Sequence, residues 1–294
     1  LMKSYHYYPG CSLKGTGRAY EESFLALCKS LDLDVTEIDD WNCCGATAYM
    51  STDRREETAL AARNLALAER DPHDVITPCN ACYLVLNKAL RRLKEDARVR
   101  SRVEGALATL DLPLPDTVRV RHPLDVLVND VGLDAIKSAV TRSLDGLQVA
   151  PYYGCQVVRP WSTFDDPHAP TTMDELLKAV GAKVVDYPSK TRCCGASQTG
   201  TMPEIGLELV YALLKDAHDH GAEVIATICP LCQFNLEASQ DQVRSRWSID
   251  PIPVVYVSQL MGWALGLSSK QLGLQRAIVP VEPLLNGRTA DVTA

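Results

Sequence analysis

Two stretches decide the fold of this chain: Cys43-Cys44-Gly45-Ala46 with Cys79-Asn80-Ala81-Cys82, and Cys193-Cys194-Gly195-Ala196 with Cys229-Pro230-Leu231-Cys232. In both, 34 residues separate the second vicinal cysteine from the Cys-x-x-Cys pair. One more cysteine precedes each set, Cys11 by 31 residues and Cys155 by 37. Matching positions are offset by 144 residues for this first cysteine and by 150 for the other four. A self-similarity of this length indicates a duplicated domain.

Hydrophobic periodicity predicts strands that alternate with helices in each half. We expect strands over 3–8, 34–39, 74–77 and 117–121, and again over 148–153, 183–187, 223–228 and 252–257. Helices are predicted over 17–31, 52–70, 80–95, 123–131, 171–180, 203–219 and 230–246. This order favours an α/β protein with two tandem Rossmann-like parallel sheets flanked by helices. We place the boundary at the stretch near 140–147, giving a first domain over 1–146 and a second, with a C-terminal tail, over 147–294.

Each group of cysteines follows a predicted strand and precedes a predicted helix. The carboxyl ends of parallel strands share one edge of a sheet, so five sulfurs should gather there in each half. Extended backbone would point vicinal sulfurs to opposite faces, whereas a turn eased by Gly45 or Gly195 can bring both to one side. The eleventh cysteine, Cys28, lies on an apolar stripe of a predicted helix, and we interpret it as a core residue.

Composition excludes several classes of protein. The 294 residues are 46% hydrophobic and 23% charged, as in a globular protein, and the net charge of −7 disfavours nucleic-acid binding. No apolar run is long enough to span a membrane, and no export signal is evident, so we expect a cytoplasmic protein. In such a reducing compartment, clustered cysteines indicate metal binding or redox chemistry.

The number of cysteines in each half limits which kind of metal site they can form. Structural zinc takes four ligands and commonly two Cys-x-x-Cys pairs, whereas each half has five cysteines and one such pair. A cubane [4Fe–4S] cluster also takes four cysteines, so five indicate a cubane plus a free thiol or a cluster of unusual shape. Buried core cysteines and a dithiol relay are the other interpretations. Matched sets of five favour neither of them.

The cysteine pattern and its flanks resemble the heterodisulfide reductase B-subunit family, which carries two cysteine-rich CCG domains. The likeness includes Tyr153-Gly154-Cys155 with Arg159-Pro160, Met173-Asp174-Glu175-Leu176-Leu177, Gly181-Ala182, and Asp186-Tyr187-Pro188 with Lys190 ahead of Cys193. It covers the chain to about residue 275. Both sets of five cysteines are complete.

The resemblance implies one non-cubane [4Fe–4S] cluster per domain, each ligated by five cysteines. The two ligand sets would be Cys11, Cys43, Cys44, Cys79 and Cys82, and Cys155, Cys193, Cys194, Cys229 and Cys232. It also implies the reversible two-electron cleavage of a disulfide, such as the coenzyme M–coenzyme B disulfide or an analogue, between the two clusters. Because an iron–sulfur cluster normally transfers one electron, two clusters match this two-electron reaction.

Three other residues are candidates for the site. His122 follows a predicted strand and is our candidate proton donor to a leaving thiolate, the alternative being a helix cap. Arg159 and Lys190 flank cysteines of the second half and would bind an anionic substrate or balance the charge of the cluster.

The source of electrons lies outside this chain, because the sequence has neither a nucleotide-binding motif nor a ferredoxin cysteine run. The resemblance implies a ferredoxin-like iron–sulfur subunit and a flavin subunit as partners, with a thiol coenzyme or its disulfide as substrate. The alternative function is an iron–sulfur electron-transfer subunit of a quinone-linked or sulfur-oxidising complex.

Overall fold

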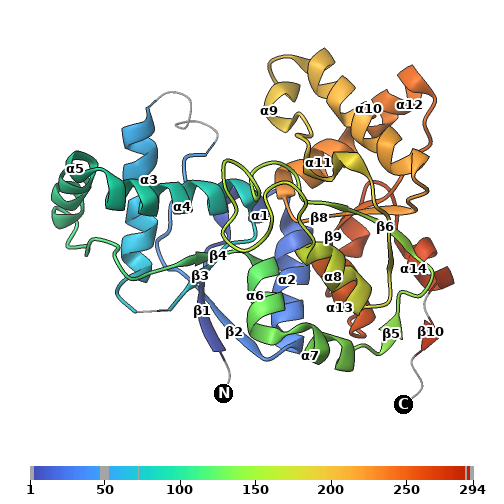
Figure 1. Cartoon of the computed structure of the whole chain (residues 1–294), viewed down its shortest axis with the longest axis horizontal. Helices are drawn as coiled ribbons and strands as arrows, with labels where there is room; N and C mark the ends of the chain where they lie inside the picture. The colour runs from blue at the N-terminus through green and yellow to red at the C-terminus, as the bar shows by residue number, and fades with distance from the viewer. Residues whose placement is uncertain (1–2, 47–52, 72, 289, 292–294) are drawn as a thin grey trace. The chain divides into compact units, whose positions relative to one another are not determined.

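The computed structural model describes residues 3–46, 53–71, 73–288 and 290–291. The chain divides into two compact units (Figure 1). The first unit consists of Leu1–Cys11 and Asp32–Pro123, and the second of Ser12–Leu31 and Leu124–Ala294. The predicted start of a helix at residue 52 lies outside the described residues.

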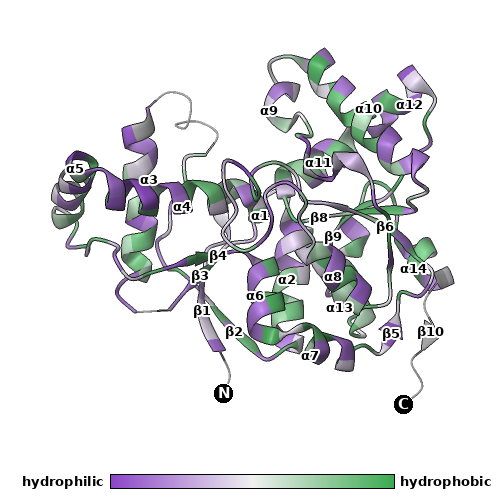
Figure 2. Cartoon of the chain, viewed as in Figure 1, coloured by the Kyte–Doolittle hydropathy of each residue, from purple (hydrophilic) through white to green (hydrophobic). Residues whose placement is uncertain are grey.

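A four-stranded parallel sheet in the order β2-β1-β3-β4 organises the first unit. Its elements are β1 (Lys3–Tyr7), β2 (Leu33–Glu37), α3 (Arg54–Ala68), β3 (Val75–Ile76), α4 (Asn80–Glu95), α5 (Ala97–Ala108) and β4 (Val120–Arg121). Short α1 (Gly10–Leu13) follows β1. Small and branched side chains close the core between the helices: Ala62, Ala66, Leu93, Val103 and Leu107. Figure 2 shows apolar residues in β3 and β4 and polar ones along α5.

The second unit repeats the same strand order, β7-β6-β8-β9, again fully parallel. The strands are β6 (Gln148–Tyr152), β7 (Lys183–Val184), β8 (Val224–Thr227) and β9 (Val254–Tyr256), with a small antiparallel pair of β5 (Arg142–Ser143) and β10 (Ala290–Asp291). The helices are α2 (Arg18–Ser30), α6 (Pro123–Val126, with Pro123 counted in the first unit), α7 (Leu133–Ser138), α8 (Thr172–Ala179), α9 (Ala196–Thr199), α10 (Pro203–Asp219), α11 (Pro230–Ala238), α12 (Gln240–Trp247), α13 (Val257–Ala264) and α14 (Glu282–Arg288). The predicted α/β class with two Rossmann-like parallel sheets is therefore confirmed.

The compact units differ from the division at residues 146 and 147, because Ser12–Leu31, which contains α2, and residues 124–146 belong to the second unit. The ring of Tyr20 on α2 stacks on Tyr256, with centroids 4.3 Å apart, and the buried hydroxyls of Ser23 and Ser258 are 2.7 Å apart. Arg276 adds an ion pair to Glu22 at 2.7 Å. A helix encoded in the first repeat is thus packed within the second unit. Cys28, also on α2, is 1% exposed, as its apolar stripe predicts.

The eight predicted strands are all present. Among the described residues, six α-helices were not predicted (α1, α5, α7, α9, α13 and α14), and neither was the pair of β5 and β10. Helix α5 begins after Asp96, whose carboxylate accepts the backbone N–H groups of Arg98 and Val99 and caps the helix. All eight residues of α13 are buried, including the polar Ser258 and Gln259, so no exposed face distinguishes this short helix from a buried strand in the sequence. The predicted helix over 230–246 divides at Ser239 into α11 and α12. In the described part of the chain, no helix is long and apolar enough to cross a membrane.

Candidate metal centres

The first unit brings five sulfurs into one continuous group. Cys11 and Cys43 are 3.9 Å apart and Cys44 and Cys82 are 3.3 Å apart, measured between Sγ atoms. Cys43 also contacts Cys44, and Cys82 contacts Cys79. Loops and helix starts supply them: Cys11 lies in α1, Cys79 caps α4, and Cys82 lies in the first turn of α4. The order of contacts is therefore 11–43–44–82–79.

The second unit reproduces this order of contacts with the equivalent residues. Cys155 contacts Cys193, which contacts Cys194. Cys194 and Cys232 are 3.5 Å apart, and Cys232 contacts Cys229. None of the eleven cysteines forms a disulfide. The duplication seen in the sequence is therefore also a duplication of sulfur geometry.

Burial divides each group of five in the same way. Cys44, Cys79 and Cys82 are 2–3% exposed, and their equivalents Cys194, Cys229 and Cys232 are also buried. The first two cysteines of each group are accessible: Cys11 and Cys43 are exposed, Cys193 is exposed and Cys155 is half-buried. Each unit thus has three buried cysteines and two cysteines that solvent can reach.

A left-handed glycine follows each vicinal cysteine pair and confirms the predicted turn. Gly45 has a φ of 86° and Gly195 a φ of 83°, values that glycine adopts without strain. The backbone N–H of Gly195 donates to Cys193 Sγ at 3.4 Å, and that of Ala196 donates to Cys194. In the first unit Gly45 and Ala46 donate to Cys43 and Cys44. The turn therefore directs two N–H dipoles at two sulfurs and favours their negative charge.

A second glycine, directly before the first cysteine of each group, lets the backbone approach the second sulfur of the Cys-x-x-Cys pair. A Cβ atom on Gly10 would lie 2.7 Å from Cys82 Sγ, and one on Gly154 would lie 3.3 Å from Cys232 Sγ. Both glycines have positive φ, 70° and 69°. A side chain at either position would enter the space of a candidate ligand.

A buried tyrosine forms a hydrogen bond to the backbone immediately before each vicinal cysteine pair. The hydroxyl of Tyr8 donates to the carbonyl of Asn42 at 2.7 Å, and that of Tyr152 donates to the carbonyl of Arg192 at 2.7 Å. These acceptors are the residues directly before Cys43 and Cys193. Burial, followed by the nearby sulfurs, raises the pKa of both tyrosines, so the hydroxyls stay protonated donors.

We expect Tyr8→Phe and Tyr152→Phe each to lower the free energy of unfolding by about 1 kcal/mol, the usual net value of one such hydrogen bond. The measurement is the urea midpoint of the cluster-loaded protein. Tyr211→Phe is the matched control, because the Tyr211 ring stacks on Trp247 and no hydrogen bond of its hydroxyl is found among the described residues. Equal midpoints for all three variants would contradict the supporting role.

The ionisation of the thiols tests whether these sulfurs suit an iron–sulfur group. The hydrogen bond from Cys43 lowers the pKa of Cys44 to about 4 and raises the pKa of Cys43 itself. In the second unit, the bond from Cys155 lowers the pKa of Cys193, and the pKa of Cys155 rises. One member of each vicinal pair, Cys44 or Cys193, therefore favours the thiolate form. Five soft donors in this state fit a cationic iron centre, which deprotonates its thiol ligands.

One known protein family matches the chain twice, once in each half. The cysteine-rich CCG domain matches residues 5–87 and 149–237. The chain belongs to the CCG family. Relatives that match most of its length include the B subunits of heterodisulfide reductases, so this is a cysteine-rich polypeptide of the heterodisulfide reductase type and an oxidoreductase subunit. Family membership implies that the chain carries iron–sulfur clusters.

Several relatives cover nearly the whole chain, among them two of different named function. The B subunit of the ferredoxin/F420H2-dependent CoB-CoM heterodisulfide reductase of Methanosarcina acetivorans is 34% identical over 93% of this chain and 93% of its own length. The 8-methylmenaquinol:fumarate reductase membrane anchor subunit of Wolinella succinogenes is 31% identical over 97% of this chain and 100% of its own. A crystal structure of a hypothetical protein from Helicobacter pylori has the same fold, with a TM-score of 0.75 at 14% identity over 95% of this chain. The chain spans 52% of that protein's length.

The structure buries His122 beside the Cys-x-x-Cys helix of the first unit. It is 0% exposed, and its Nε2 donates to Asn80 Oδ1 at 3.1 Å. Its ring packs edge-to-face on Tyr83, with centroids 5.6 Å apart. Since Asn80 directly follows Cys79, His122 contacts the Cys-x-x-Cys segment and does not face solvent.

Arg159 and Lys190 both bind protein groups near the second set of cysteines. Arg159 Nη1 donates to the carbonyl of Thr191 at 2.6 Å. Lys190 Nζ lies 3.2 Å from Asp174 Oδ1, and the backbone carbonyl of Lys190 accepts the N–H of Tyr153 and Gly154. The two cations therefore brace the segment that leads into Cys193.

Sequence reasoning did not find the asparagines that fix the cysteine loops. Asn64, fully buried on α3, exchanges hydrogen bonds of 2.8 and 2.9 Å with the backbone of Asn42. Asn235 on α11 donates to the carbonyl of Cys194 at 2.8 Å and accepts from Thr199. An asparagine inside an apolar helical stretch was the available signal, since a buried amide needs partners.

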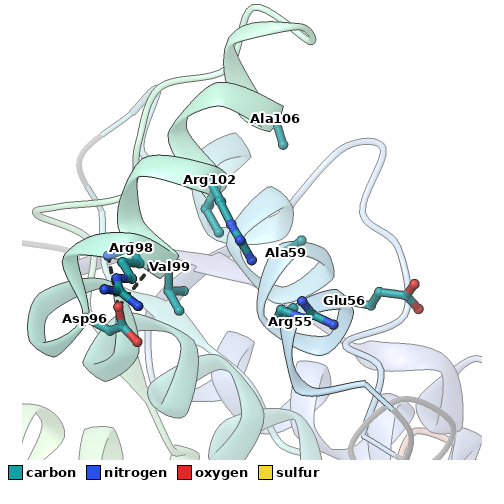
Figure 3. A pocket seen from close by; sticks show the side chains of 9 residues that line it. Arg55, Glu56, Ala59, Asp96, Arg98, Val99, Arg102 and Ala106 are labelled. Atoms are coloured by element: carbon teal, nitrogen blue, oxygen red, sulfur yellow. Dashed lines mark hydrogen bonds between the residues drawn. The ribbon is translucent and has the colours of Figure 1, made fainter.

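A separate groove of about 530 Å³ lies between α3 and α5 of the first unit (Figure 3). Its apolar floor consists of Ala59, Val99, Val103 and Ala106, and its charged rim of Arg55, Glu56, Asp96, Arg98 and Arg102. In Figure 3, Arg102 extends from α5 toward α3, and Asp96 accepts backbone N–H groups at the start of α5. None of the predicted site residues is among those that line this groove.

Proposed function

We propose that this chain is the catalytic subunit of a heterodisulfide reductase-type complex, and that it cleaves a disulfide reversibly into two thiols. The reaction is RSSR′ + 2e⁻ + 2H⁺ → RSH + R′SH. The observation that carries the proposal is the repetition of one five-sulfur constellation, with the same order of contacts and the same buried members. Two equivalent one-electron centres match a substrate with two sulfur atoms and a demand for two electrons.

The ligands of the first non-cubane [4Fe–4S] cluster would be Cys11, Cys43, Cys44, Cys79 and Cys82, and those of the second would be Cys155, Cys193, Cys194, Cys229 and Cys232. When bound, the pair supplies the two electrons, one from each centre. In each unit the three buried sulfurs anchor the group, and the two accessible sulfurs leave it open to substrate on one side.

The charged and titratable neighbours are proposed to position this machinery. His122, which is fully buried, would orient Asn80 and so the first turn of the Cys-x-x-Cys helix. Arg159 and Lys190 would hold the loop before Cys193 and offset the negative charge of the second centre. His122 stays the candidate proton donor to one leaving thiolate, and solvent on the accessible side would supply the other proton.

The electrons would come from partner subunits. The CCG relatives named as heterodisulfide reductase subunits indicate a multi-subunit complex. We propose a ferredoxin-like iron–sulfur subunit as the direct donor, which a flavin subunit would in turn reduce. The disulfide of coenzyme M and coenzyme B is the first substrate to test, with other coenzyme disulfides as analogues.

The proposal predicts about eight irons and eight acid-labile sulfides per chain after anaerobic reconstitution, for two four-iron clusters. The loaded chain should oxidise reduced benzyl viologen when the coenzyme M–coenzyme B disulfide or an analogous disulfide is added. An electron paramagnetic resonance signal that changes on addition of thiol or disulfide would support a catalytic role. A chain with four irons or fewer, or with no response to any disulfide, would contradict it.

The second candidate is an electron-transfer subunit of a quinone-linked complex. It is favoured by the full-length similarity to the Wolinella succinogenes subunit, which is named for a menaquinol:fumarate reductase. The same loaded chain distinguishes the two: oxidation of its clusters by a menaquinone analogue, together with no response to disulfides, would favour this alternative.

A further inference from the structure

A second group of metal-ligating side chains lies in the first unit, apart from the cysteines. His6 is on β1, and Asp71 and His73 belong to the connection between α3 and β3. In the described part of the chain, one ligand atom from each of these three residues lies within 4.8 Å of the other two. Residues 65 positions apart in the sequence are thus brought together by the parallel pairing of β1 with β3, in which His6 faces Val75.

The three side chains already contact one another. His73 Nδ1 lies 3.1 Å from Asp71 Oδ2, and His6 Nε2 lies 3.9 Å from the same oxygen. The two imidazole rings meet edge-to-face with centroids 5.7 Å apart. Both histidines therefore approach one carboxylate oxygen from different elements, which is the convergence that a shared ion requires.

The backbone holds this arrangement in place. The carbonyl of Asp71 accepts His6 Nε2 at 2.8 Å and the backbone N–H of His73 at 2.7 Å. The side chain of His6 is 15% exposed and fixed on a strand, whereas those of His73 and Asp71 are 41% and 61% exposed. One ligand is thus rigid, and the other two leave an open side where water can complete the coordination shell.

We propose that His6, Asp71 and His73 form a binding site for a divalent transition-metal ion such as Zn²⁺ or Ni²⁺. Imidazole suits zinc, copper, iron and nickel, and two imidazoles with a carboxylate leave positions for water. Binding through His6 Nε2 moves its proton to Nδ1, because only a ring nitrogen with a free lone pair is a ligand. The ion would replace the present bond to the Asp71 carbonyl and would tie β1 to the connection before β3.

The test is calorimetric titration of the cluster-loaded chain with Ni²⁺ under anaerobic conditions, with iron content measured before and after. Loading occupies the ten cysteines, which would otherwise bind the added metal. We expect saturable binding of one ion per chain without loss of iron. His73→Ala and His6→Ala should weaken it about 100-fold or more, since even changes around a ligand cost 10–100-fold.

His220→Ala is the matched control, because His220 pairs with Asp216 at 3.3 Å in the second unit and belongs to no group of three ligands among the described residues. It should bind Ni²⁺ as the unchanged chain does. Asp71→Asn, which keeps the shape of the side chain, tests the site if a histidine variant folds poorly, and iron content reports on folding. No saturable binding, or binding that the His6, Asp71 and His73 variants all leave unchanged, would overturn the proposal. Its outcome is independent of the disulfide chemistry, which the iron content and dye assay measure.

Discussion

Replacing Cys44 or Cys194 with serine is expected to remove one of the two iron–sulfur centres and to abolish disulfide turnover. Each of these sulfurs contacts two others, Cys43 and Cys82 in one unit and Cys193 and Cys232 in the other. Each is also buried, 2% and 3% exposed, so solvent cannot substitute for the lost ligand. Iron per chain should fall from about eight to about four, because the other unit keeps its own five sulfurs.

Cys28→Ala provides the control for these variants. Cys28 is as buried as Cys44, but it lies on α2 outside both groups of five. It should keep about eight irons and full turnover while costing stability through a small cavity, as deletion of a buried atom does. Full turnover in Cys44→Ser or Cys194→Ser would show that one centre suffices and would refute the paired-centre mechanism.

Gly10→Ala is expected to empty the first centre although it changes no ligand. The added Cβ would lie 2.7 Å from Cys82 Sγ, closer than real Cβ atoms approach a neighbour, so the sulfur of the buried Cys82 would have to shift. We expect iron per chain to fall to about four, with loss of disulfide turnover. Gly154→Ala, whose Cβ would lie 3.3 Å from Cys232 Sγ, should have a smaller effect on the second centre.

Gly132→Ala separates backbone strain from the contact with sulfur. Gly132 has a φ of 88°, so alanine there carries the conformational cost of a positive φ, but its Cβ would meet nothing within 4 Å. This variant should be destabilised and yet keep about eight irons. If Gly132→Ala and Gly10→Ala lost iron equally, the effect would come from strain and not from the approach to Cys82.

The prediction of the fold from the sequence succeeded where the pattern was local or duplicated. Alternating strands and helices were readable because half-buried elements carry a periodic apolar face. Helix α13 was missed because every one of its residues is buried, and α5 because its start depends on the single capping residue Asp96. The placement of α2 in the second unit was not predictable, since it depends on the contact of Tyr20 with Tyr256.

The sequence by itself determined the two sets of five cysteines, the glycine turns that follow the vicinal pairs, and the parallel sheets that gather the sulfurs at one edge. Those follow from spacing and residue type, which the chain carries locally. Only the tertiary structure decided which sulfurs are buried, that Tyr8, Tyr152, Asn64 and Asn235 hold the cysteine loops, and that His6 meets Asp71 and His73. These depend on contacts between residues far apart in the chain, and such contacts exist only once the strands have paired.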